Sequence, residues 1–551
     1  MNAFRRLLQV WPWLAAIFSG VLCTLCFPPF NQNWLCWIAL TPLIAAVWFS
    51  GRNLKRRWLR NLLLGYVAGI VFFTGTFSWL GSLGSLFDSF WLKGLPLLLS
   101  LYLGLHLAFW SWFIGLIAPT DFLSSRRNLQ TAFFGASAWV VHEWVRGWLF
   151  GGFGWNGLGV ALHANWPLIQ IAEFTGITGL SFAIAFVNVI AVTAPLRFSV
   201  EARTRRMRPH FDLTLTMVGI VGLFTFGIQS VRNPPVTNPL RVAAVQANIP
   251  QREKFDPKYF DVVKQKLDYL GSLAHQANFT PELIVYPESS IPGTFEGYDT
   301  VQLLGTMAED PGVDVIAGII DEKDDHAYNA AVFVSRNGEM QIYRKIHLVP
   351  FGEYIPLRHS FPLFAAVASK WVPGDFAAGQ DYTVFRLTNP DVQVAPLICF
   401  EDTIGELTRK FVLAGASLLV DVTNDGWFLH SAGSQQHLAN AIFRCVETRR
   451  PMIRAANTGV TCFVNDFGRV TQLLQDETGS TFTEGVLTDE IDVPTRSELT
   501  FYTRNGELFA KVCTWITLIV IGGTVLLRGW RGWPGGSRVP PREVKHGTQG
   551  A

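Results

Sequence analysis

The stretch Pro396-Leu397-Ile398-Cys399-Phe400-Glu401-Asp402 places a cysteine at the end of a short apolar run, directly before two acidic residues. Such a run predicts a buried β-strand, and the spaced apolar residues from about 403 to 414 predict a helix after it. A thiol at this junction projects past the edge of the sheet, and the helix N-terminus helps to stabilise its thiolate. The stretch therefore predicts an α/β domain with Cys399 as a candidate nucleophile.

Similar β-prone runs lie on both sides of this stretch. The predicted strands cover residues 241–246, 283–286, 313–320, 329–335, 340–345, 393–399, 417–423, 451–456 and 460–465. Helical segments lie between several of them, at about 257–277, 298–309, 403–414 and 433–448. Solidly apolar strands that alternate with helices predict sheets buried against helices.

The two ends of the chain differ in composition from this domain. The chain has 551 residues, of which 49% are hydrophobic and 16% are charged. Of its 42 acidic residues, six lie before residue 230 and one lies after residue 508. Because membrane spans exclude carboxylates, residues 230–508 form one polar domain between hydrophobic ends. This composition excludes an ordinary soluble protein and a disordered chain, and the net charge of +3 does not indicate a nucleic-acid partner.

Eight apolar stretches have about the length needed to cross a bilayer. They lie near residues 10–27, 34–50, 61–83, 95–118, 131–150, 168–195, 212–229 and 509–527. The first could instead be a cleaved signal peptide, but it ends in Phe27-Pro28-Pro29-Phe30 rather than at a small-x-small site, and further spans follow at once. We therefore expect a multi-pass membrane domain of about eight helices that retains the first one.

Lysine and arginine residues mark alternate sides of these spans. They precede the first span and follow the second, fourth, sixth and eighth, whereas the loops 28–33, 84–94 and 151–167 contain only Lys93. By the positive-inside rule, both termini are cytoplasmic and residues 230–508 are extracytoplasmic. The predicted organisation is a seven-helix transmembrane region over 1–229, an extracytoplasmic domain over 230–508, a final transmembrane helix over 509–527 and a basic cytoplasmic tail over 528–551.

The cysteines do not predict a disulfide framework. Their number, seven, is odd, and four of them (Cys23, Cys26, Cys36 and Cys513) lie in apolar runs. The Cys23-x-x-Cys26 spacing occurs in metal and redox motifs, but no second pair accompanies it and it lies in a lipid-facing run. We therefore expect no metal site there.

Two further segments place charged side chains at strand ends. Tyr286-Pro287-Glu288-Ser289 closes one apolar strand with a carboxylate, and Lys345 lies at the end of another. Glu288 is suited to act as a general base for the Cys399 thiol, and Lys345 could stabilise the oxyanion of a tetrahedral intermediate with a backbone N–H near Phe400. Each residue alone has an ordinary explanation, as a solvated rim charge or an inert core thiol, but their shared placement favours a catalytic site.

The order Pro287-Glu288, Lys345, Cys399 resembles the Glu–Lys–Cys triad of the nitrilase superfamily, whose fold is an α-β-β-α sandwich. The insertion of such a domain between seven leading helices and one trailing helix resembles the apolipoprotein N-acyltransferase family in particular. The other segments that carry the resemblance are 143–148, 246–251, 351–356, 423–428, 436–437 and 454–459.

This resemblance implies a two-step, ping-pong acyl transfer in a bacterial inner membrane, with the α/β domain in the periplasm and with no cofactor or metal. Cys399 would take an acyl group from a phospholipid as a thioester. The α-amine of a diacylglyceryl-cysteine at the N-terminus of a lipoprotein would then receive it as an amide, because a thioester retains enough acyl-transfer energy. Glu353 would orient the lysine or the amine, and Glu401 would be a further supporting residue.

Two positions depart from the family pattern. Phe255 stands where the family often has Trp, and Phe400 follows the nucleophile where Tyr is usual, so any role of that hydroxyl is absent. Because both implied substrates are lipids, the site must open toward the bilayer. Residues 361–372 have the composition of a lid that dips into the interface, and Trp427-Phe428-Leu429 is a second candidate. The alternative is that these residues fill the domain core.

Within the membrane part, Glu143 and Arg146 are three residues apart on one predicted helix. This spacing predicts a salt bridge in preference to a substrate contact.

Two other functions compete with acyl transfer. A membrane-tethered nitrilase-type amidase that hydrolyses an extracytoplasmic amide would use the same triad, but it gives no reason for eight spans and an apolar lid. A non-enzymatic lipid-binding or scaffold protein is not favoured, because all three triad residue types are present.

Overall fold

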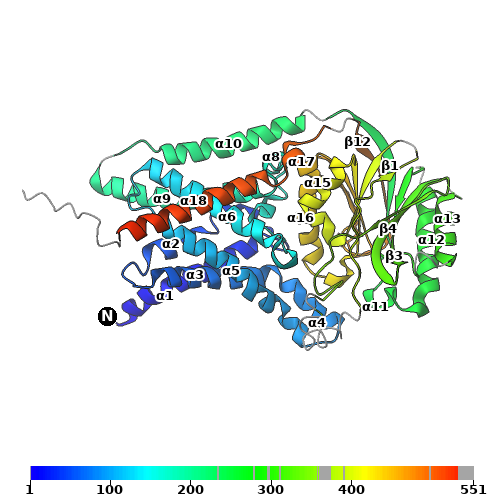
Figure 1. The fold of residues 1–551 in the computed structure, drawn as a ribbon, viewed down its shortest axis with the longest axis horizontal. Coiled ribbons are helices and arrows are strands. Elements are labelled where there is room, and N and C mark those ends of the chain that lie inside the picture. The colour runs from blue at the N-terminus through cyan, green and yellow to red at the C-terminus, as the bar shows by residue number, and fades with distance from the viewer. Residues whose placement is uncertain are drawn as a thin grey trace, which may run out of the picture.

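The computed structural model describes residues 2–205, 207–232, 235–276, 280–293, 298–309, 312–355, 358, 374–388, 391–495 and 498–531. A bundle of helices and an α/β domain lie end to end (Figure 1). The bundle combines the beginning and the end of the chain, and the α/β domain is built from the segment between them. The predicted lid at 361–372 lies outside the described residues.

The main helices of the bundle coincide with the eight apolar stretches. They are α1 (Asn2–Leu25), α2 (Thr41–Phe49), α3 (Arg57–Thr76), α5 (Leu95–Leu116), α6 (Ser125–Arg146), α9 (Thr178–Thr204), α10 (Phe211–Arg232) and α18 (Leu508–Arg531). Short helices join them: α4 (Leu83–Leu86), α7 (Trp166–Ile169) and α8 (Ala172–Thr175). The sixth predicted span is therefore divided, because residues 166–175 form α7 and α8 before α9 begins.

Five helices of the described chain are long and apolar enough to cross a membrane: Arg57–Thr76, Trp91–Leu116, Thr178–Thr204, Phe211–Arg232 and Leu508–Leu526. Two shorter apolar helices cover Gln9–Leu25 and Asn33–Phe49. Helix α6 is less apolar, because it begins with Arg126 and Arg127 and ends with Glu143 and Arg146. The crossing of a membrane by eight helices, and its direction, stay predictions.

Small residues allow α3 and α5 to pack closely. A Cβ added to Gly65 would lie 2.3 Å from the Cβ of Ser111, and one added to Gly69 would lie 2.7 Å from the Cα of Gly104. Membrane helices commonly use small residues in this way, because van der Waals packing rather than the hydrophobic effect holds them together in lipid.

The α/β domain contains two six-stranded sheets, ordered β12-β1-β2-β3-β4-β5 and β11-β10-β9-β8-β7-β6. The strands of the first are β1 (Thr237–Gln246), β2 (Leu283–Val285), β3 (Asp314–Lys323), β4 (His326–Val334), β5 (Met340–Arg344) and β12 (Gly485–Pro494). Those of the second are β6 (Phe385–Arg386), β7 (Gln393–Ile398), β8 (Leu418–Thr423), β9 (Met452–Ala456), β10 (Cys462–Val464) and β11 (Val470–Leu473). In each sheet the central strands β1-β2-β3 and β7-β8-β9 are parallel.

Helices cover the outer face of each sheet, so the layers follow the expected α-β-β-α order (Figure 1). Helices α12 (Phe260–Gln276) and α13 (Tyr298–Glu309) lie on the first sheet, where Leu267 and Leu304 join its apolar core. Helices α15 (Gly405–Leu413) and α16 (Gly433–Thr448) lie on the second sheet and face the bundle. The short helices α11 (Gln251–Lys254) and α17 (Phe501–Asn505) complete the domain.

All nine predicted strands are present, and three others were not predicted. Strand β12 is the longest of these, and it pairs antiparallel with β1 at the edge of the first sheet. Its residues 485–489 are half-buried, and its charged residues Glu490 and Asp492 are exposed. Edge strands tolerate such charges, which hides them from a search for apolar runs.

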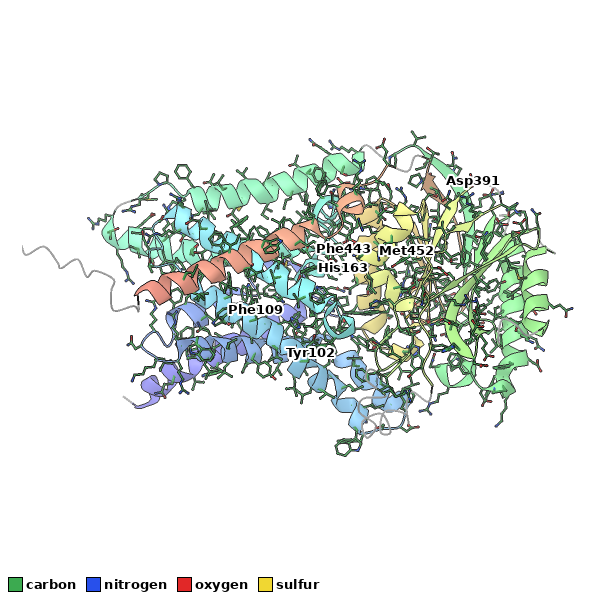
Figure 2. All side chains as sticks on the ribbon, in the orientation of Figure 1. Tyr102, Phe109, His163, Asp391, Phe443 and Met452 are labelled. Atoms are coloured by element: carbon green, nitrogen blue, oxygen red, sulfur yellow. The ribbon has the colours of Figure 1, made fainter. Side chains whose placement is uncertain are left out.

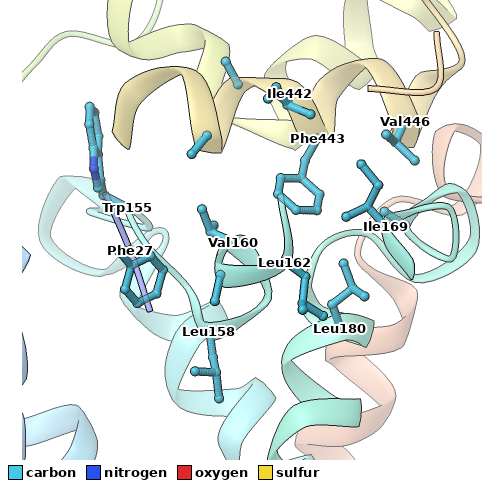
Figure 3. Packing of buried hydrophobic residues seen from close by; sticks show 14 of the residues in the cluster. Phe27, Trp155, Leu158, Val160, Leu162, Ile169, Leu180, Ile442, Phe443 and Val446 are labelled. Atoms are coloured by element: carbon cyan, nitrogen blue, oxygen red, sulfur yellow. The ribbon is translucent and has the colours of Figure 1, made fainter. Parts of the chain in front are cut away.

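Helix α16 fixes the α/β domain on the bundle. Its apolar side chains, including Ile442, Phe443 and Val446, pack against Leu162 and Ile169 (Figure 3). Its Gln436 is 1% exposed and makes five hydrogen bonds to the bundle. They are Trp79 Nε1 to Oε1 (3.0 Å), Trp155 Nε1 to Oε1 (3.3 Å), Asn156 Nδ2 to Oε1 (2.9 Å), Nε2 to Pro28 O (2.8 Å) and Nε2 to Thr76 O (3.0 Å).

Candidate active site

Cys399 lies at the end of β7, as predicted, in an unusual backbone conformation. Its φ is +55°, in the left-handed region that residues with a side chain rarely adopt. The residue begins a 3₁₀ turn, η7 (Cys399–Thr403), and helix α15 starts only at Gly405, slightly later than expected. A strained strand-to-helix turn of this type is common at functional sites, because it aims one side chain away from both elements.

Glu288 and Lys345 follow strands β2 and β5, and the structure brings both to Cys399. The Cys399 thiol interacts electrostatically with each of them. Both charges are buried, with 7% of Glu288 and 1% of Lys345 exposed. Gly318 of β3 allows this approach, because a Cβ there would lie 2.4 Å from the Cα of Glu288.

Asn329 joins the two acidic side chains of the site. Its Nδ2 donates to Glu288 Oε1 and to Glu353 Oε1, each at 2.7 Å. Glu353 Oε1 also accepts a hydrogen bond from Lys345 Nζ at 2.9 Å, and its Oε2 accepts one from Val349 N at 2.7 Å. Glu353 therefore orients the lysine, one of the two roles expected for it. Asn329 was not predicted, because nothing distinguishes it within the apolar run of β4.

One carboxylate oxygen of Glu288 remains unused. Glu288 Oε2 is buried and has no hydrogen-bond partner in the described part of the chain. Because Oε1 is held by Asn329, the other oxygen is available to accept a proton.

A second buried lysine was missed in the sequence. Lys254 of α11 is 4% exposed, and its Nζ donates to the backbone oxygen of Glu288 at 2.5 Å. Burial lowers the pKa of Lys254 to about 8, against the opposing effects of Glu288 and Cys399. Lys254 follows the family-like segment 246–251 by three residues and precedes Phe255, which is itself 47% exposed.

The pKa directions correct one expectation. Burial, followed by the charge of Glu288, raises the pKa of the Cys399 thiol well above its usual value, and Lys345 only partly offsets this. Burial also raises the pKa of Glu288. The resting cysteine is therefore a thiol rather than a stabilised thiolate, because desolvation outweighs the local helix geometry. A base must remove its proton during attack.

Glu401 fixes the two strand ends that carry Lys345 and Cys399. It is 0% exposed, and its Oε1 accepts hydrogen bonds from Ile346 N (2.8 Å) and His347 N (2.9 Å). Its Oε2 accepts one from Ile398 N at 3.0 Å. Burial raises the pKa of Glu401 to about 7. Its contacts are those of a positioning residue.

Aromatic rings connect the site to the bundle. Phe400 stacks on Phe153 and Trp155, with centroids 6.2 and 6.1 Å away and planes within 7° of parallel. Trp427, in the second candidate lid, is half-buried and stacks on Phe87 at 6.3 Å. These contacts turn the Cys399 side of the domain toward the bundle.

A fully buried ionic network lies behind Cys399. His437 Nε2 is 2.9 Å from Asp402 Oδ1, and its Nδ1 is 2.9 Å from Asp425 Oδ1. Arg454 is 3.5 Å or less from three carboxylates, those of Asp402, Asp421 and Asp425. Asp402 raises the pKa of His437 to about 9 despite burial, which acts to lower it. The network joins β8, β9 and α16 to the turn that follows Cys399.

The predicted Glu143–Arg146 salt bridge does not form. Glu143 Oε1 accepts hydrogen bonds from Trp139 Nε1 at 2.7 Å and Leu158 N at 2.6 Å. The Arg146 guanidinium lies over the ring of Phe73, at 5.2 Å from its centroid. Helical spacing brought the two residues near one another, but other donors occupy the carboxylate.

The described residues contain no group of three or more His, Cys, Asp or Glu side chains placed to hold a metal ion.

Comparisons with known proteins agree with this architecture. Residues 19–190 match the family model of the apolipoprotein N-acyltransferase N-terminal domain, and residues 241–500 match that of carbon-nitrogen hydrolases. The chain is 32% identical to the apolipoprotein N-acyltransferase of Geobacter metallireducens, over 91% of this chain and 93% of that one. It is 33% identical to that of Methylococcus capsulatus, over 83% of this chain and 86% of that one.

Proposed function

Because the chain belongs to the apolipoprotein N-acyltransferase family, we propose that it transfers an acyl group from a membrane phospholipid to the N-terminal amine of a diacylated lipoprotein. The observation that carries this proposal is the convergence of Cys399, Glu288 and Lys345 on the side of the α/β domain that faces the bundle. Cys399 is the nucleophile, Glu288 the base and Lys345 the oxyanion-stabilising cation.

The first half-reaction forms a thioester. Glu288 Oε2 accepts the thiol proton as the Cys399 sulfur attacks an ester carbonyl of the phospholipid, and Lys345 stabilises the oxyanion. Collapse of this intermediate breaks the ester C–O bond. The leaving alkoxide takes the proton back from Glu288 and departs as a lysophospholipid. Coupling proton transfer to attack suits a thiol whose pKa is raised by burial.

The second half-reaction forms an amide. The free amine of the lipoprotein cysteine attacks the thioester carbonyl, gives a proton to Glu288 and expels the sulfur, which regains a proton from Glu288. The Lys254 cation near Cys399 disfavours an ammonium at this place and so favours the nucleophilic free amine.

Aromatic contacts support acyl transfer over the alternative, hydrolysis of an extracytoplasmic amide. Phe400, Phe153 and Trp155 form a stacked apolar wall next to Cys399, which suits an acyl chain and limits the approach of water. An amidase of small polar amides has no need of such a wall.

An adduct experiment tests the proposal. Detergent-purified protein incubated with labelled phospholipid is expected to gain the mass of one acyl chain, in a form that hydroxylamine releases. Cys399→Ala should lose this adduct, whereas Cys445→Ala, which removes a buried thiol of α16, should keep it. No adduct on the unchanged protein, or its survival in Cys399→Ala, contradicts the proposal.

The second substrate separates the two activities. A diacylated lipopeptide should discharge the adduct to an amide of the peptide, whereas an amidase would release free fatty acid to water. Release of acid at the same rate with and without lipopeptide would favour hydrolysis.

We place the active site on the periplasmic face of a bacterial inner membrane, with both chain ends in the cytoplasm. Single cysteines introduced into a cysteine-free variant test this arrangement: a membrane-impermeant maleimide should label residue 325 in whole cells, but not residue 203. The reverse pattern would contradict it.

A further inference from the structure

Arg146, at the end of α6, is a buried cation with few partners. Its side chain is 2% exposed, and its Nε and Nη1 atoms have no hydrogen-bond partner among the residues that the structure describes. Nη2 makes one long contact, 3.5 Å, with Gly154 O. A guanidinium has five N–H donors, and burying them without acceptors is costly.

No side chain among the described residues makes an ion pair with Arg146, although Glu143 interacts with it electrostatically. Tyr102 Oη and both ring nitrogens of His142 are buried and also lack partners within the described chain. The nearest carboxylate, Glu143, already accepts two hydrogen bonds from other groups. His106 stacks edge-on against Tyr102 at 5.5 Å. This cluster, Tyr102, His106, His142 and Arg146, therefore contains several buried polar atoms without partners, and its guanidinium offers donors only.

The cluster lies directly beneath the candidate active site. The Arg146 backbone oxygen accepts a hydrogen bond from Phe153 N at 2.8 Å, and the Phe153 ring stacks on Phe400, the neighbour of Cys399. Figure 2 shows Tyr102 on the part of α5 nearer to the α/β domain, with Phe109 further away. One short loop thus connects the unpaired cation to the nucleophile.

The cluster reaches the surface on the side of α5. Tyr102 is only half-buried, and its ring contacts Phe150 at 6.0 Å. Phe150 is 79% exposed. An exposed aromatic ring therefore lies next to Tyr102 on the side from which a lipid of the bundle surface would approach.

We propose that Arg146, together with Tyr102, binds the phosphate diester of the phospholipid that donates the acyl group. A planar guanidinium matches phosphate oxygens with two parallel N–H donors, and the tyrosine hydroxyl supplies a third. The acyl ester of a phospholipid is separated from its phosphate by a glycerol unit alone. Binding the phosphate below Phe153 therefore brings an ester toward Cys399. This inference rests on the proposed function, and the lipoprotein acceptor carries no such phosphate.

The test compares two acyl donors with the same chains, phosphatidylethanolamine and diacylglycerol, in the thioester-forming step of the full-length protein. Arg146→Gln should lower the preference for phosphatidylethanolamine by about 10- to 100-fold, mainly through KM, because one charge-assisted contact is lost. Tyr102→Phe should lower it by less. Arg126→Gln, the same exchange at the exposed start of α6, should leave the ratio unchanged.

Arg146→Lys is the control for a folding defect. It keeps the positive charge but lacks the planar guanidinium with its two parallel N–H donors. It should recover part of the preference. An unchanged donor ratio in Arg146→Gln, alongside a normal acyl-enzyme, would overturn the phosphate site and leave the proposed function standing. Failure of the unchanged protein to form any adduct would overturn both.

A free phosphate ion, rather than a lipid, could also be the ligand of Arg146 and Tyr102. Inorganic phosphate that slows acylation by diacylglycerol in the unchanged protein, but not in Arg146→Gln, would assign the site to the free anion and overturn the lipid assignment.

Discussion

Two buried polar clusters of this molecule differ in one respect. In the α/β domain, Arg454 and His437 lie within 3.5 Å of carboxylates, and all of these side chains are 0% exposed. In the bundle, Arg146 is almost as deeply buried, yet two of its nitrogens have no partner in the described chain. The charges of the first cluster are all paired with opposite charges, although Asp402 Oδ1, both carboxylate oxygens of Asp421 and His437 Nε2 lack a hydrogen bond among the described residues. In this sense of charge pairing, the first cluster is complete and the second is incomplete.

This difference gives a criterion for distinguishing structural charges from functional ones. A buried charge is tolerated when opposite charges and hydrogen bonds compensate its desolvation, and removing one partner is then costly. A buried charge without compensation is a cost that stability alone does not explain. We therefore expect such a charge to bind a ligand.

Breaking the complete cluster should have the largest effect. Arg454→Leu would leave Asp402, Asp421 and Asp425 without their shared cation, and the free energy of unfolding should fall by about 3–5 kcal/mol. Thermal unfolding in detergent measures this. The exchange Arg386→Leu at the exposed end of β6 is the control, and equal melting temperatures for both variants would contradict the comparison.

Glu288 resembles Arg146 in one respect: its Oε2 is buried and has no hydrogen-bond partner among the described residues. Glu288→Gln keeps the shape of the side chain but cannot accept the thiol proton, so acyl-enzyme formation should slow about 10²- to 10⁴-fold. Stopped single-turnover assays with intact mass detection measure the rate. A decrease of less than about threefold would remove Glu288 from the role of base.

Titration of the complete cluster should weaken it at high pH. The folded pKa of His437 is about 9, above the unfolded value of about 6.5. The raised pKa means that its contribution is fully present below pH 6.5 and is lost as the pH rises through 9. Stability should fall over this window by about 3 kcal/mol at most. His437→Gln should show a flatter melting-temperature profile, and an identical slope would contradict the assignment.

Loss of the Gln436 contacts should have a smaller effect. Gln436→Leu removes five hydrogen bonds and leaves their partners in the bundle unsatisfied, which should cost about 1–3 kcal/mol. Limited proteolysis at the junction should then accelerate. The neighbouring exposed position provides the control, Gln435→Leu, and equal cleavage rates for both variants would show that Gln436 does not hold the two parts together.

The smallest change in stability is expected at Arg146, where the direction of the change is the informative result. Arg146→Met replaces an uncompensated cation with an apolar chain of similar length, so the melting temperature should stay the same or rise, by the equivalent of about 1 kcal/mol. A loss as large as that of Arg454→Leu would show that Arg146 is as structural as Arg454.

Much of this arrangement could be predicted from local sequence. Cys399, Glu288 and Lys345 each lie at the end of an apolar strand, and these positions in the sequence already grouped them. Asn329 and Lys254 could not be found in this way, because their roles depend on which oxygen atoms other strands bring to them. The Glu143–Arg146 prediction failed because spacing on one helix says nothing about competing donors such as Trp139 and the backbone of Leu158. The thiolate prediction failed because burial at Cys399 is a property of the whole fold.

The five hydrogen bonds of Gln436 restrict how the α/β domain can move relative to the bundle, and so how substrates can exchange. Because these bonds fasten α16 to three separate segments of the bundle, a movement of the α/β domain away from the bundle would break all five together. If the proposed function holds, donor and acceptor reach Cys399 without such a separation of the two parts. We then expect departure of the first product, rather than chemistry at sulfur, to limit turnover.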